Sequence, residues 1–159
     1  MGIEDRISGP EITVRDALAA DVPLLAQADS VATAGHSGRR DEILHWVATA
    51  GTRVAQAQGR VAGYCVTEHT FFGHAFVAML VVAENARGLG VGTRLLLDAQ
   101  QRRTNPKLFT STNLSNQPMQ RLLTRLGWQS AGIVHGLDDE DPELFFRAPE
   151  PAPEHSPPR

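Results

Sequence analysis

The stretch that decides the fold runs from Phe76 to Arg103 and reads FVAMLVVAENARGLGVGTRLLLDAQQRR. Its first residues form a short apolar run, which is typical of a buried strand. A polar turn follows, with glycines at the alternate positions Gly88, Gly90 and Gly92. The residues after Gly92 then place apolar side chains at helical spacing. The stretch therefore predicts a strand, a glycine-rich turn and the start of an amphipathic helix.

Such a turn favours an anion site. The first N–H groups of a helix lack intrahelical acceptors, and the helix dipole adds partial positive charge there. Glycine has no Cβ, so the backbone can approach a phosphate closely. A Walker loop is excluded because no Gly-Lys-Ser/Thr follows, and the Gly-x-Gly-x-x-Gly spacing of dinucleotide-binding turns is missing whether it is counted from Gly88 or Gly90. A turn that serves only tight packing is the structural alternative.

The order Arg87-x-x-Gly90-x-Gly92 after the apolar run resembles the acyl-CoA loop of the GNAT superfamily of N-acyltransferases. A second segment, NQPMQRLLTRLGW from Asn116 to Trp128, is similar to a later motif of that family, Asn-x-x-Ala-x-x-Leu-Tyr-x-x-Leu-Gly-Phe. The resemblance covers roughly residues 12–147. Two motifs in sequence, with the expected element types between them, are more specific than either one alone.

Periodicity along the chain predicts an α/β fold of the α+β type with element order βααβββαβαββ. The resemblance implies the same: a GNAT-like, mixed, mostly antiparallel central sheet flanked by helices. We expect a flexible lead-in over residues 1–10, one N-acyltransferase domain over residues 11–148 and a proline-rich disordered tail over residues 149–159. The predicted strands are residues 12–15, 52–57, 61–68, 74–82, 107–112, 128–134 and 143–147. Helices are predicted to start at Asp21, at Asp41, after the glycine-rich turn and at Ser115 or Asn116.

Composition sets broad limits on function. The 159 residues contain 42% hydrophobic and 21% charged residues and carry a formal net charge of −3. This charge does not favour a nucleic-acid or anionic-membrane surface. One cysteine excludes an intrachain disulfide and suits a cytoplasmic location, and the scattered histidines do not indicate a metal site. No segment is expected to act as a signal peptide or to span a membrane.

The resemblance implies a set of residues that bind acetyl-CoA, which would be a co-substrate. Loop amides would hold the pyrophosphate, and the backbone at the end of the central strand would hold the pantetheine arm and the acyl carbonyl. Asn116 matches the family's asparagine near the CoA arm, although Asn is also a common helix N-cap. The implied residues are Leu80, Val81, Val82, Arg87, Gly88, Leu89, Gly90, Val91, Gly92, Thr93 and Asn116.

The sequence departs from the family at two catalytic positions. Leu123 stands where many members have the tyrosine that protonates the thiolate, and Ser111 stands where some have a glutamate base. The remaining candidates for acid or base are Ser115, His74 and Glu68, each with an ordinary alternative as a helix cap or a solvated strand end. The one thiol, Cys65, is interpreted as core packing.

These features predict an N-acetyltransferase that acts on a small-molecule or peptide amine by direct attack in a ternary complex. The alternative is an acyl-CoA-binding regulatory or sensor module with little or no turnover, and a nucleotide-binding protein is a remote third. The acidic turn Asp138–Asp141 would attract a cationic amine if it lay over the site, but a solvated turn is the commoner role. Neither nucleic acid nor membrane is an expected partner, and a homodimer is left open.

Overall fold

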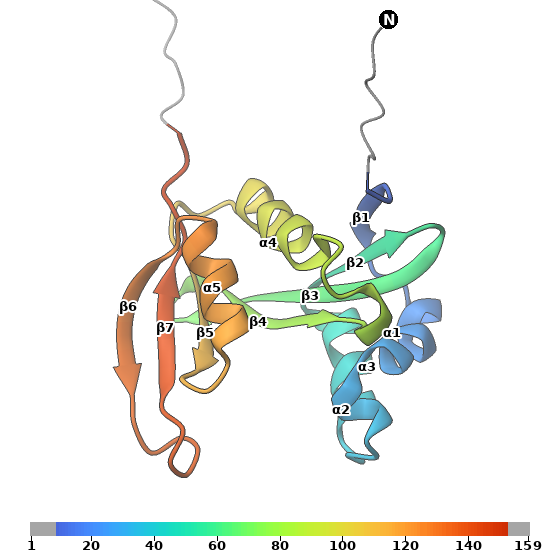
Figure 1. The fold of residues 1–159 in the computed structure, drawn as a ribbon, viewed down its shortest axis with the longest axis horizontal. Helices are drawn as coiled ribbons and strands as arrows, with labels where there is room; N and C mark the ends of the chain where they lie inside the picture. The colour runs from blue at the N-terminus through green and yellow to red at the C-terminus, as the bar shows by residue number, and fades with distance from the viewer. Residues whose placement is uncertain (1–8, 153–159) are drawn as a thin grey trace, which may run out of the picture. The chain divides into compact units, whose positions relative to one another are not determined.

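In the computed structural model, residues 9–152 are described, and they form a seven-stranded sheet with the order β1-β2-β3-β4-β5-β7-β6 (Figure 1). Contacts divide the chain into two compact units. The first contains the residues up to Thr67 together with Met79–Asp98, and the second contains Glu68–Ala78 together with the residues from Ala99 on. The predicted fold class, a mixed and mostly antiparallel sheet flanked by helices, is confirmed.

The predicted elements agree closely with the observed ones. His74–Val82 and Glu143–Arg147 have the predicted bounds, and the other strands differ by a few residues at their ends. The strands are β1 (Ile12–Asp16), β2 (Gly51–Ala57), β3 (Arg60–Phe71), β4 (His74–Val82), β5 (Leu108–Asn113), β6 (Gln129–Val134) and β7 (Glu143–Arg147). The helices are α1 (Val22–Ala28), α2 (Ser30–Thr33), α3 (Arg39–Thr49), α4 (Val91–Arg102) and α5 (Gln117–Arg125), with 3₁₀ turns η1 (Ala19–Asp21) and η2 (Glu84–Ala86).

The expected lead-in and tail fall largely on residues 1–8 and 153–159, which lie outside the described residues. The boundaries given for the single domain remain a prediction. In the part of the chain that is described, no helix combines the length and the apolar character that crossing a membrane requires.

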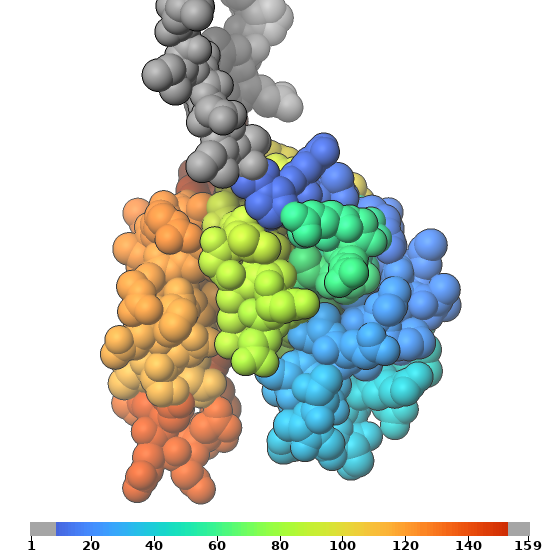
Figure 2. All heavy atoms as spheres, turned by 45° about the vertical axis from the view of Figure 1, so that its right-hand side comes forward, coloured from blue at the N-terminus to red at the C-terminus, as the bar shows by residue number. Residues whose placement is uncertain are grey.

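The first unit is built on two antiparallel pairings, β1 with β2 and β2 with β3. Figure 2 shows the tip of the β2–β3 hairpin (green) lying against β1 (dark blue). Helices α1 and α3 pack on this part of the sheet through one apolar cluster. Burial of these side chains supplies the main stabilisation of the unit. The buried members of the cluster are Val22, Leu25, Ile43, Val54, Tyr64 and Val66.

A buried polar pair crosses this cluster. The Tyr64 hydroxyl donates to Asp29 Oδ2 at 2.7 Å, and both residues are almost completely buried. The other oxygen of Asp29 accepts from the backbone N–H groups of Val31 and Ala32, which start the short helix α2. This helix was not predicted, because four residues carry no periodic pattern. Asp29 therefore both caps α2 and satisfies the phenol, as a buried polar group requires.

The second unit joins β5, β7 and β6 by antiparallel pairing. Figure 1 shows α5 in front of β5 and β7, and Leu123 of α5 is fully buried. Leu108, Thr110 and Phe146 are buried on these strands and alternate with the half-buried Phe109 and Phe145. Because side chains of a strand alternate between its faces, β5 and β7 bury one face under α5 and present phenylalanines on the other.

The chain's one tyrosine makes the polar pair measurable. Burial raises the pKa of Tyr64 far above the ordinary 10.0, and the Asp29 carboxylate raises it further. A raised pKa stabilises the fold fully below pH 10, and this stabilisation is lost as pH rises above 10, because the unfolded chain then releases a proton that the folded chain keeps. Tyrosinate absorbance should therefore appear only together with loss of the far-ultraviolet circular dichroism signal. Tyrosinate formation in a still-folded protein near pH 10 would contradict this prediction.

Candidate functional site

The predicted anion loop lies between the end of β4 and the start of α4. After β4, Ala83 and the η2 turn lead into Arg87, and the backbone then takes positive φ at Gly88 (78°) and Gly90 (87°). Side chains at such φ values are strained, so glycine is the fitting residue at both places. Residues 87–90 are exposed, whereas Val91 and Gly92 are buried. The loop therefore presents its backbone to solvent while Val91 anchors the helix in the core.

The start of α4 has the geometry that an anion needs. Arg94 N–H donates to the Gly90 carbonyl at 3.0 Å, which makes Gly90 the N-cap of the helix. Val91 begins the first turn of α4, where backbone N–H groups have no acceptor within the helix. Within the described part of the chain, the exposed Arg87 guanidinium has no hydrogen bond or ion pair. The helix dipole and the exposed Arg87 side chain together favour a phosphate at this helix start.

Gly63 determines how closely β3 approaches the end of β4. A Cβ built on Gly63 would lie 2.3 Å from the Val81 carbonyl oxygen, 3.2 Å from Val82 Cα and 3.2 Å from Val91 Cγ1. Only glycine allows this approach. Gly63 was not among the predicted site residues, although a glycine inside a strand pattern signals close backbone contact. The residue thus positions both Val81, whose backbone was predicted to hold the pantetheine arm, and the first residue of α4.

The parallel pairing of β4 with β5 is short. It joins Ala75 to Leu108, Phe76 to Phe109 and Val77 to Thr110. At the last of these positions the buried Thr110 hydroxyl donates to the Val77 carbonyl at 2.8 Å. The Val77 carbonyl thus accepts a side-chain hydrogen bond at the point where the pairing of β4 with β5 ends.

Ser115 and Asn116 lie in the connection from β5 to α5. Asn116 Oδ1 accepts from Met119 N–H at 3.2 Å, so this residue has the ordinary N-cap role that the sequence left open. Ser115 Oγ donates to Asp141 Oδ2 at 2.5 Å, and its N–H donates to Asp141 Oδ1 at 3.0 Å. Asp138 Oδ2 accepts from the Asn113 amide at 2.8 Å. The acidic turn is therefore fastened to the β5–α5 connection.

The other catalytic candidates are dispersed. His74 opens β4, at the opposite end of the strand from Val82, and its Nδ1 lies 3.5 Å from the Asn105 amide nitrogen. Glu68 is half-buried on β3. Cys65 is 1% exposed, and burial raises the pKa of its thiol to about 12, which makes it a poor nucleophile. The assignments of Ser115, His74 and Glu68 therefore remain predictions.

Leu123 is fully buried, because neighbouring atoms leave 0% of its surface exposed to solvent. Ser111 is half-buried and pairs with Phe145 of β7. Leucine at position 123 thus has a packing role. Among the described residues, no group of three or more His, Cys, Asp or Glu side chains could hold a metal ion.

Comparison with known proteins identifies the family. The model of the acetyltransferase (GNAT) family matches residues 22–128. The chain belongs to the GNAT acetyltransferase family. This match includes the predicted anion loop and the motif that begins at Asn116. Among proteins of curated function, none matches the sequence.

Solved structures support the same fold. A GNAT family acetyltransferase from Bacillus cereus has 26% sequence identity and a TM-score of 0.82, over 89% of this chain and 99% of that chain. The Salmonella typhimurium protein yncA, solved with its cofactor acetyl-CoA, has 18% identity and a TM-score of 0.71 over 92% and 98%. The ribosomal-protein-alanine N-acetyltransferase of Brucella melitensis has 21% identity and a TM-score of 0.69 over 85% and 98%.

Gly63→Ala should destabilise the protein by roughly 1–3 kcal/mol, the usual range for overpacking, because the new methyl group meets backbone atoms that cannot rotate away. Thermal unfolding measures the loss. Gly51→Ala is the matched control on β2, because its Cβ would lie at a milder 3.3 Å from the Thr67 carbonyl oxygen. Equal melting temperatures for the two variants would contradict the proposed constraint.

Leu123→Tyr tests whether position 123 is purely structural. Because the leucine is fully buried, a phenol there should strain the core and cost roughly 1–3 kcal/mol, with no gain in turnover. Leu123→Met, a swap of similar volume, should cost less and serves as the control. A folded Leu123→Tyr variant with raised turnover would instead mean that the site lacked only an acid at this position.

Proposed function

We propose that the protein transfers an acetyl group from acetyl-CoA to a primary amine of a small molecule or peptide, by direct attack in a ternary complex. The observation that carries the proposal is the exposed loop Arg87–Gly90, which leads directly into the N-terminus of α4 at the N-cap Gly90. This geometry suits a diphosphate. Because the chain belongs to the GNAT family, we infer that the diphosphate is that of acyl-CoA. Direct attack by the amine needs no protein nucleophile, which agrees with the buried, poorly nucleophilic Cys65.

The donor site in this proposal has three parts. The N–H groups of residues 88–93 and the Arg87 side chain hold the pyrophosphate. The backbone of Leu80–Val82 holds the pantetheine arm and orients the acetyl carbonyl. Asn116, which caps α5, is the residue that the family resemblance assigns to the arm. The apolar side chains of residues 80–82 are half-buried, which allows strand backbone to serve a ligand while the side chains pack.

Proton transfer would use groups other than the usual ones. Leu123 cannot donate a proton, and Ser111 is a poor base. Ser115 is the nearest candidate in sequence to Asn116, and its hydroxyl proton points at Asp141. In this proposal Asp141 holds the Ser115 side chain, and water accepts the proton from the attacking amine. We also infer a cytoplasmic location, because a single cysteine suits a reducing compartment.

A second candidate function is an acyl-CoA sensor without turnover. Leucine and serine at the two catalytic positions favour it, since the chain then keeps the donor site and lacks side-chain acid and base. The two functions differ in one measurable quantity. An enzyme releases free CoA when acetyl-CoA and an amine are both present, whereas a sensor binds acetyl-CoA without releasing CoA for any amine.

Calorimetric titration with acetyl-CoA tests the donor site, and Gly90→Asp should abolish binding because its carboxylate would face the pyrophosphate. Gly90→Asn is the matched control, since asparagine tolerates positive φ about as well as aspartate and is neutral.

Arg87→Ala should raise Kd roughly 5–30-fold, a loss of about 1–2 kcal/mol. Arg60→Ala removes an equal charge from an exposed position of the same unit and should leave Kd unchanged.

Chromatographic measurement of CoA release across a panel of amines then separates enzyme from sensor. Failure to bind acetyl-CoA at millimolar concentration would overturn both functions. Equal Kd values for the Asp and Asn variants at position 90 would show that the loop is not the anion site.

A further inference from the structure

The phenylalanines of the second unit form one cluster on the face of β5 and β7 away from α5. Phe71 lies at its centre, with ring centroids 4.9 Å from Phe76, 5.3 Å from Phe109 and 5.7 Å from Phe145. Phe72 meets Phe71 edge-on at 5.1 Å. Every phenylalanine of the chain except Phe146 thus belongs to this cluster. Aromatic side chains gathered this way are common at ligand sites.

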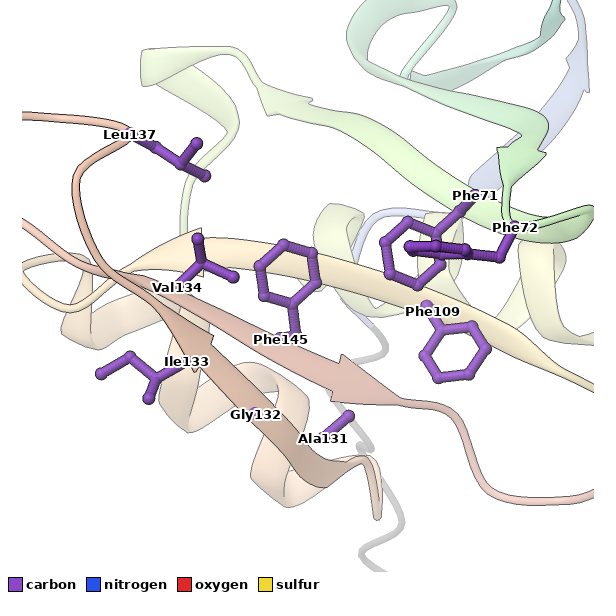
Figure 3. Close-up of a pocket in the computed structure, with 9 residues that line it drawn as sticks. All are labelled: Phe71, Phe72, Phe109, Ala131, Gly132, Ile133, Val134, Leu137 and Phe145. Atoms are coloured by element: carbon purple, nitrogen blue, oxygen red, sulfur yellow. The ribbon is translucent and has the colours of Figure 1, made fainter.

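Four of these rings, those of Phe71, Phe72, Phe109 and Phe145, line one side of an open pocket of about 460 Å³ (Figure 3). The other side is formed by β6 residues 131–134 and by Leu137. Its volume lies within the range of roughly 300–1,000 Å³ that is typical of small-molecule sites. The side chains that line it are all apolar, so the pocket fits an aromatic or branched aliphatic group.

Phe72 is unusual in its backbone and in its exposure. It has φ of 51°, a value that bulky residues rarely adopt, and its side chain is 88% exposed. Gly or Asn would form the Phe72–Gly73 turn at lower cost. A strained, exposed aromatic residue at the rim of a pocket favours a role in binding over a role in folding.

The charged residues at the two ends of the pocket differ in sign. The acidic turn follows Leu137 directly, and within the described chain the carboxylates of Asp139 and Glu140 have no hydrogen bond or ion pair. At the Phe109 end, Lys107 and Arg147 line a neighbouring depression that shares Phe109 and Ala131 with the pocket. A cationic group is therefore favoured at the Leu137 end and disfavoured at the other.

The acidic end of the pocket is also the end attached to the β5–α5 connection. Asp138 accepts from Asn113, and Asp141 accepts from Ser115, the neighbour of Asn116. Because the family resemblance assigns Asn116 to the CoA arm, an amine drawn to this turn lies at the connection that carries Asn116. The apolar group and the amine of one ligand would thus contact different residues along one face of the second unit.

We propose that this pocket binds the acceptor, and that the acceptor is a primary amine carrying an aromatic or branched aliphatic group. The inference rests on the proposed function, since it names the substrate class of that reaction. The apolar group lies against Phe71, Phe109 and Phe145, with Phe72 closing over it. The amine lies toward the acidic turn.

The test compares 2-phenylethylamine with ethanolamine, first for binding without donor and then as acceptors with saturating acetyl-CoA. We expect 2-phenylethylamine to bind at least roughly tenfold more tightly and to show a correspondingly lower KM, because its ring removes apolar area from water. Ile133→Lys should raise its Kd roughly tenfold, by placing a cation and removing apolar surface in the pocket. Ile133 is 48% exposed, so this variant should fold.

Leu44→Lys is the matched control, because Leu44 is 52% exposed on α3 of the first unit. It should leave both amines unaffected. Equal KM values for the two amines, in an enzyme that binds acetyl-CoA and releases CoA, would overturn the inference and leave the proposed function intact. If acetyl-CoA does not bind, the proposed function fails, and 2-phenylethylamine binding that Ile133→Lys weakens would still support the pocket as an amine site.

Sedimentation of the wild type and of Ile133→Lys tests the alternative that a second copy of the chain, and not an amine, occupies this face. A wild-type dimer that the substitution dissociates, together with unchanged amine binding, would assign the face to subunit contact and overturn the inference. A sedimentation coefficient that the substitution leaves unchanged, together with weakened amine binding, would support it.

Discussion

The close approach of β3 to β4 at Gly63 is the constraint on which the candidate donor site depends. A hydrogen atom in place of a side chain brings the backbone of β3 against the Val81 carbonyl and the Val91 side chain at once. Val91 is the first residue of α4, so this contact also positions the helix start and the loop before it. Ala83 N–H donates to the Ala62 carbonyl at 2.8 Å and continues the contact beyond the end of β4. The loop can therefore be exposed and glycine-rich while its two ends are held by the core.

Ion pairs hold the edges of the first unit to this centre. Arg53 of β2 contacts Asp98 of α4 through two nitrogen atoms at 2.9 Å each, and contacts Asp16 of β1 at 2.7 Å. Arg15 forms a two-bond pair with Asp21, and the pKa of Asp21 is lowered chiefly by that hydrogen bond. Bidentate pairs of arginine with a carboxylate are directional. They fix the sheet edge and the helix ends in orientation as well as in distance.

Much of the fold was predictable because its patterns are local. The apolar run before Gly88 and the helical spacing after Gly92 predicted β4 and α4. Contacts between distant segments were not predictable. Asp29 reaches Tyr64 and Asp141 reaches Ser115 only through the tertiary structure. Phe72 at positive φ contradicts its own turn propensity, and such a conflict shows itself only in the folded backbone. For the same reason, the aromatic pocket could not be derived from phenylalanines spread between residues 71 and 145.

The burial of Cys65 has a consequence for how the reaction can be followed. Cys65 is the chain's one cysteine, it is shielded from solvent, and the raised pKa keeps its sulfur protonated at neutral pH. Thiol-specific reagents react with the thiolate form of accessible sulfur. In the folded protein such a reagent would leave the polypeptide unmodified and react with free CoA as it forms. Product can then be detected continuously by its colour reaction, with no background from the protein and no need to replace the cysteine.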